Sequence, residues 1–207
     1  MTKLGTSLLV VFAITGCGGK KDDKGGGDKA GGGGGASIGT IDIAAVNALV
    51  PKELKDKLVF EQKPIVLERG KHPTTYTLAV PKGWTQEGKM FGTIKADSNG
   101  GFFSGMKISS DCDGACEPKK WEAIADKNFF VEQLKGKVIK DEKGANQRLV
   151  VADTDRNGVK TTNVVFAWWQ EGAKSYHVCT ANLDEAIKAA APAFEKACQA
   201  VTVEGDD

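Results

Sequence analysis

The chain has 207 residues, with 28 Lys and Arg against 27 Asp and Glu, which gives a formal net charge of +1. So balanced a charge, with no stripe of basic and aromatic residues, argues against nucleic-acid binding, and we expect no nucleic-acid partner. The length suits one folded domain with a core of its own, and the sequence contains no internal repeat.

The N-terminus is typical of an export signal. Lys3 is followed by a compact apolar run, Leu8–Ile14, and then by small residues. The run is much shorter than the about 20 residues that cross a bilayer as a helix, so a retained transmembrane helix is not expected. We therefore interpret residues 1–16 as a signal peptide.

The four residues that end this signal, Ile14-Thr15-Gly16-Cys17, resemble the lipobox of bacterial lipoproteins. The resemblance implies attachment of a lipid to the Cys17 thiol, cleavage before Cys17, and acylation of the new N-terminus with a fatty acid such as palmitate. Gly18, where Asp often marks inner-membrane retention, favours the outer membrane. The resemblance thus predicts a lipid-anchored protein of the cell envelope that faces the periplasm.

Residues 17–36 contain the lipidated cysteine and a tether made almost entirely of Gly, Lys, Asp and Ala. Such a segment has no apolar surface to offset the entropy lost on ordering, so we expect it to be disordered. A Gly-rich coil of this length spans about 25 Å, enough to hold a domain away from a membrane surface.

Residues 37–207 are predicted to form a single α+β domain. Thr40 is expected to cap a short helix that reaches Val50, and a second helical turn follows Pro51. The next predicted elements are a strand at 58–68, a turn at His72-Pro73, a strand at 75–80, and a hairpin of strands 89–96 and 102–109.

The second half of this domain contains two predicted helices. One begins near Pro118 and extends to Leu134, and the other covers Leu183 to Val201, with a break or kink at Pro192. Between them we expect strands at 137–142, 147–153, 159–170 and 176–179. The order predicts a mostly antiparallel sheet covered by a mid-chain helix and a C-terminal helix.

One strand carries a resemblance to a known group. The segment Tyr76–Trp84 alternates and closes in Val-Pro-Lys-Gly-Trp, which resembles the early strand of the PsbP/Mog1-like group. The resemblance implies an antiparallel sheet with a terminal helix over residues 55–203. Members of that group are mostly binding or assembly factors without catalytic residues, so it assigns no site residue here.

Four further cysteines, an even number, predict two disulfides in an exported domain: Cys112, Cys116, Cys179 and Cys198. Proximity in sequence favours the pairs Cys112–Cys116 and Cys179–Cys198. A straight helix over 183–198 would be about 24 Å long and would carry Cys198 away from Cys179. The second pair therefore needs a break near Pro192 or a helix lying across the strand, and otherwise the other pairings remain open.

Cys112 and Cys116 directly precede the predicted helix at Pro118, where a helix dipole lowers the pKa of a thiol. A redox pair or half of a zinc site would use this placement. The C-x3-C spacing differs from the C-x2-C of those sites, and Asp111 and Asp113 would raise the thiol pKa instead. A structural disulfide is the favoured interpretation.

Asp153, Asp155 and Asn157 match the first half of a calcium loop, in which carboxylates at alternate positions converge on one ion. The twelfth position is Val164 instead of the expected Glu. Asn157-Gly158 between two strands is also a strong hairpin signal. The sequence therefore favours a hairpin and leaves a weak calcium site as the alternative.

The sequence contains no recognisable catalytic motif. We expect His72 to be exposed in a turn and His177 to lie on a sheet face, and Trp168 and Trp169 must face opposite sides of one strand. The function predicted from the sequence is a non-catalytic binding or scaffolding domain, anchored by lipid, with a protein partner in the envelope. The alternatives are a calcium- or ligand-responsive module and, third, an envelope thiol redox protein.

Overall fold

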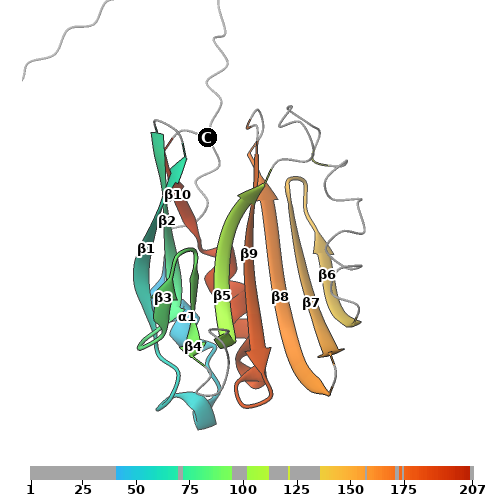
Figure 1. The fold of residues 1–207 in the computed structure, drawn as a ribbon. Coiled ribbons are helices and arrows are strands. Elements are labelled where there is room, and N and C mark those ends of the chain that lie inside the picture. The colour runs from blue at the N-terminus through green and yellow to red at the C-terminus, as the bar shows by residue number, and fades with distance from the viewer. Residues whose placement is uncertain are drawn as a thin grey trace, which may run out of the picture. The chain divides into compact units, whose positions relative to one another are not determined.

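The computed structural model describes residues 41–69, 72–94, 102–111, 121, 136–156, 158–170, 173 and 175–205. Within them the strands form two sheets in which every pair is antiparallel (Figure 1). The antiparallel sheets and the C-terminal helix agree with the predicted fold class. The signal peptide, the tether and nearly all of the predicted mid-chain helix lie outside the described residues.

The smaller sheet has the strand order β1–β2–β10. Its strands are β1 Phe60–Arg69, β2 His72–Pro81 and β10 Thr202–Glu204. The first two pair along their whole length, so His72 and Pro73, predicted as a turn, belong to β2. Strand β10 was not predicted, and its three residues are too few to carry an alternating pattern.

The larger sheet has the order β3–β4–β5–β9–β8–β7–β6. Its strands are β3 Thr85–Glu87, β4 Met90–Ile94, β5 Phe102–Asp111, β6 Lys137–Lys143, β7 Gln147–Arg156, β8 Val159–Trp169 and β9 Tyr176–Asp184. The predicted pairing of β4 with β5 and the four predicted strands after residue 136 are confirmed. The short edge strand β3 was missed.

Helix α1, Ile43–Ala48, begins at Asp42, whose carboxylate accepts a hydrogen bond from the Ala45 N–H at 3.0 Å. The cap is therefore Asp42 and not Thr40, because Asp42 is the residue whose side chain reaches the free N–H groups of the first turn. The turn predicted after Pro51 is the 3₁₀ helix η1, Lys52–Leu54.

The predicted C-terminal helix is too long at its start. Leu183 belongs to β9, a 3₁₀ turn, η2, covers Lys188–Ala190, and helix α4 covers only Ala191–Gln199. Pro192 lies in the first turn of α4, where its missing N–H costs nothing, so it starts the helix and does not kink it.

The main hydrophobic core lies around α4, which contacts α1, β2, β8 and β9. Phe194 on α4 is fully buried, and its ring lies 5.0 Å from that of Phe60 and 5.7 Å from that of Trp84. One aromatic side chain thus joins the helix to the start of β1 and to the turn after β2.

A second cluster covers the opposite face of the larger sheet. It consists of buried side chains from β7, β8 and β9 together with Trp121. In β8 the two tryptophans divide between the faces: Trp168 belongs to the main core, and Trp169 packs against the second cluster. The prediction that they face opposite sides is confirmed, and the sheet is buried on both faces along β8.

A paired carboxylate ties β6 to β7. Buried Arg148 donates two hydrogen bonds to Asp141, from Nε at 2.8 Å and from Nη2 at 2.7 Å. These bonds lower the pKa of the Asp141 carboxyl below its usual 3.8. A carboxyl whose pKa is lower in the folded state stabilises the fold above its unfolded pKa, and loses that effect as the pH falls through the folded value.

We therefore expect Asp141→Asn to lower the free energy of unfolding at pH 7 by about 1 kcal/mol, since the carboxylate is one-third exposed and partly screened. The difference from the wild-type protein should shrink as the pH falls below about 4 and through the lowered pKa of folded Asp141, where this carboxylate becomes protonated and loses its charge. Urea unfolding at pH 7 and pH 3 measures both values. An equal difference at both pH values would contradict the assigned ion pair.

Candidate functional site

A cleft of about 500 Å³ lies where β6, β7 and β8 meet the segment that follows β9. Six charged residues line it: Lys137, Asp153, Asp155, Lys160, Glu185 and Lys188. We name these six residues the charged cleft. Three strands and one connecting segment, far apart in the sequence, contribute to it.

The strand register brings these charges together. In the paired strands Lys137 lies opposite Asp153, and Asp155 lies opposite Lys160. Alternation along β7 puts both carboxylates on the face that carries buried Val151 of the main core. That is the sheet face covered by α4, and Glu185 and Lys188 line the cleft from the segment leading into this helix.

Neutral donors hold the two aspartates in position. The Thr162 hydroxyl donates to Asp153 Oδ1 at 2.7 Å, and the Gly158 N–H donates to Asp155 Oδ1 at 2.9 Å. Neither donor brings a positive charge that would compensate that of the carboxylate it contacts. The carboxylates are therefore oriented without being neutralised.

Lys188 is the cation in the cleft that forms a close ion pair, with Glu185 at 2.6 Å. The hydrogen bond from Lys188 to Glu185 raises the pKa of the lysine, and the charge of Asp153 raises it further. The pair lies at the surface, where such contacts contribute little to stability. The pair therefore joins two of the six residues of the charged cleft directly to each other.

A hydroxyl network lies on the reverse side of the same hairpin. The Thr154 and Thr161 hydroxyls are 2.8 Å apart, and Asn163 Nδ2 donates to Thr154 Oγ1 at 3.0 Å and to Thr161 Oγ1 at 3.3 Å. These bonds join β7 to β8 directly behind the carboxylates, and they fix the position of the cleft wall.

The hairpin expected at Asn157-Gly158 is confirmed by its flanks, since β7 and β8 pair up to Arg156 and Val159 and Gly158 has φ +82°. Asn157, the third predicted calcium ligand, lies outside the described residues. Asp153 and Asp155 lie in β7, where their carboxylates accept hydrogen bonds from a hydroxyl and a backbone N–H. Within the described part of the chain, no group of three or more His, Cys, Asp or Glu is arranged to hold a metal ion.

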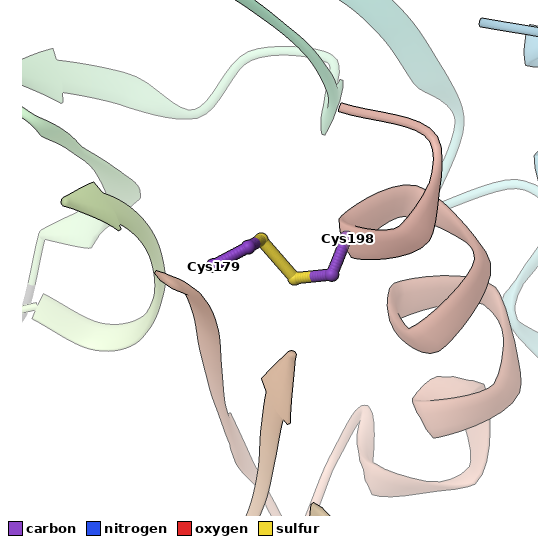
Figure 2. The surroundings of a disulfide bond; sticks show 2 residues. All are labelled: Cys179 and Cys198. Carbon is purple, nitrogen blue, oxygen red and sulfur yellow. A yellow bond between two sulfur atoms is a disulfide. The ribbon is translucent and has the colours of Figure 1, made fainter. Parts of the chain in front are cut away.

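The predicted disulfide between Cys179 and Cys198 is present, with the two Cα atoms 5.4 Å apart (Figure 2). Figure 2 shows Cys179 on strand β9 and Cys198 on the final turns of helix α4, pointing toward one another. Helix α4 starts at Ala191 and is much shorter than a helix over 183–198 would be, so Cys198 lies within reach of Cys179. Cys17, Cys112 and Cys116 lie outside the described residues.

A buried aromatic cluster that the sequence did not reveal joins the two sheets. The Tyr76 hydroxyl on β2 and His177 Nδ1 on β9 are hydrogen-bonded at 2.9 Å, and the His177 ring stacks on Trp168 at 5.2 Å. The expectation that His177 lies on a sheet face is correct, and that face is the one that carries the main core, where His177 is buried beside Trp168. The alternation of His177 with Cys179 along β9 could have indicated that the His177 side chain is buried. Nothing in the sequence indicated that Tyr76, 101 residues away, is its hydrogen-bond partner.

We expect Tyr76→Phe to lower the free energy of unfolding by about 1–3 kcal/mol, because it removes the hydroxyl from a buried hydrogen bond and keeps the ring. Urea unfolding followed by tryptophan fluorescence measures the change. An unchanged unfolding midpoint would show that this bond contributes nothing to the contact between the sheets.

Comparison with protein-family models and with curated proteins finds no match to this chain. Within the described residues, no helix has the length and apolar character that a bilayer span requires.

Proposed function

We propose that this protein is a lipid-anchored component of the cell envelope whose folded domain binds a ligand or a partner without catalysing a reaction. The observation that carries the proposal is Cys17 at the end of Ile14-Thr15-Gly16-Cys17, directly after an apolar run and directly before a Gly-rich segment. This order, signal then acceptor cysteine then tether, favours a domain held near the outer membrane on its periplasmic side.

Two structural features support the proposal. The Cys179–Cys198 disulfide suits an exported protein, since disulfides persist in oxidising compartments. The charged cleft gives the domain a concave surface on which a polar ligand can bind.

The resemblance to the PsbP/Mog1-like group remains part of this proposal. It is supported by the antiparallel strands that follow Trp84 and by helix α4. A mid-chain helix over the second sheet face is likewise proposed, supported by Trp121, which is buried against Val150 and Val178.

Metabolic labelling in an expressing bacterium with an alkyne analogue of palmitate tests the anchor. We expect the wild-type protein to incorporate the label and to fractionate with outer membranes, and Cys17→Ala to do neither. Cys179→Ala is the matched control, because it removes a cysteine that is already used in a disulfide. Equal labelling of wild type and Cys17→Ala would overturn the proposal.

A further inference from the structure

The charges in the cleft alternate across the sheet. Lys137 on β6 faces Asp153 on β7, and Asp155 on β7 faces Lys160 on β8. Side chains directly opposite one another on paired strands have Cβ atoms about 5 Å apart. Even so, among the described residues neither lysine forms an ion pair with its opposite aspartate within 4.0 Å, and the recorded ion pair in the cleft is Lys188 with Glu185.

The cleft therefore presents two ammonium groups and two carboxylates that do not neutralise one another by contact. A cation alone, such as Ca²⁺, would be attracted by Asp153 and Asp155 and repelled by the lysines. An anion alone would be attracted by the lysines and repelled by Asp153 and Asp155. A ligand carrying both charges is attracted at both of its ends.

We propose that the charged cleft binds a small zwitterion, with a primary ammonium toward a β7 carboxylate, Asp153 or Asp155, and an oxyanion toward a lysine of a flanking strand, Lys137 or Lys160. The volume of about 500 Å³ lies within the range of small-molecule sites, about 300–1,000 Å³. The inference deepens the proposed binding role and rests on it, but it does not depend on lipidation of Cys17.

Two kinds of molecule share this chemistry. In one the oxyanion is a carboxylate, as in a free amino acid or a short peptide. In the other it is a phosphate, as in ethanolamine phosphate or the headgroup of the corresponding lipid. A lysine ammonium acts as a point charge and can bind either a carboxylate or a phosphate, so the cleft suits both kinds of zwitterion. The relative affinities of the two kinds for the cleft show which one it binds.

The test is isothermal titration of the full chain in non-ionic detergent, at constant ionic strength, with four probes: ethanolamine phosphate, glycylglycine, ethanolamine and inorganic phosphate. We expect at least one zwitterion to bind about tenfold more tightly than either ethanolamine or phosphate, because it gains a second charge-assisted contact. Tighter binding of ethanolamine phosphate indicates the phosphate source, and tighter binding of glycylglycine the carboxylate source.

Variants locate the site. Lys160→Ala and Asp155→Asn should each weaken zwitterion binding about tenfold. Lys107→Ala, which removes an exposed lysine on β5 outside the cleft, is the matched control and should bind as the wild type does. A melting curve for each variant separates lost binding from lost folding, and Lys160→Gln offers a second neutral variant that keeps much of the side-chain length.

Zwitterions that bind no more tightly than phosphate alone would overturn the inference, as would equal weakening by Lys107→Ala and Lys160→Ala. A chain that incorporates the palmitate analogue but binds no zwitterion refutes this inference and leaves the anchor intact. A chain that binds a zwitterion but is not labelled at Cys17 refutes the anchor alone.

Discussion

Replacing Cys179 and Cys198 together by alanine is expected to lower the free energy of unfolding by about 3 kcal/mol. The two cysteines are 19 residues apart, and in the chain-entropy model a loop of this length restricts the unfolded chain by that amount. For a domain of this size the melting temperature should fall by about 6–12 °C. Thermal and urea unfolding of the double variant measure the effect.

The control is the wild-type protein unfolded in the presence of a strong reductant. Reduction breaks the same cross-link without changing the sequence, and it also breaks the predicted Cys112–Cys116 disulfide, so the reduced protein should lose at least as much stability as the double variant. If the double variant unfolds at the wild-type temperature in oxidising buffer, the assigned disulfide contributes nothing to the fold.

Phe194→Ala should be at least as damaging. The ring is fully buried and touches aromatic side chains of two other segments, Phe60 and Trp84. Truncating a buried phenylalanine removes its transfer free energy and leaves a cavity, at a cost of about 3–5 kcal/mol. Urea unfolding with tryptophan fluorescence is a direct measurement, since Trp84 stacks on this ring.

Phe194→Leu is the matched control, because it keeps most of the volume and should lose far less stability than the alanine variant. Phe91 is buried in the same core but lies far from Phe194 in the sequence, so it is a second position at which the same substitution can be compared. A loss below about 1 kcal/mol for Phe194→Ala would contradict the central position given to this side chain.

Much of the sheet architecture could be predicted because its strands have strong local signals. Strands β7 and β8 contain apolar runs, Leu149–Ala152 and Val164–Trp169, and are joined by Asn157-Gly158, and both were predicted close to their observed bounds. Strands β3 and β10, with three residues each, have no pattern of their own and exist only because longer strands pair with them. The division into two sheets is likewise a tertiary property.

The start of the C-terminal helix shows a competition between two periods. Leu183 and Ile187 fit a helical stripe with Phe194, and this spacing predicted a helix from residue 183. In the structure, Leu183 pairs with Thr162 and belongs to β9, and helix α4 begins only at Ala191. Long-range strand pairing overrode local spacing, which a single sequence cannot reveal.

The candidate site was predictable in part. Asp153 and Asp155 were singled out as possible metal ligands, and both line the cleft. Lys137, Lys160 and Lys188 had no signal, because a lysine on an exposed strand or turn is ordinary. The register of β6 against β7 and of β7 against β8 brings Lys137 and Lys160 beside the aspartates, and Lys188 lines the cleft from η2, after β9.

The position of α4 and β10 has a consequence for biogenesis. Residues 191–204 supply the helix that fills the core and the strand that completes the smaller sheet against β2, more than 100 residues earlier. Such non-local contacts form late and slowly. A growing polypeptide without these residues lacks the helix that fills its core, so we expect the domain to become compact only after its C-terminal segment has been synthesised.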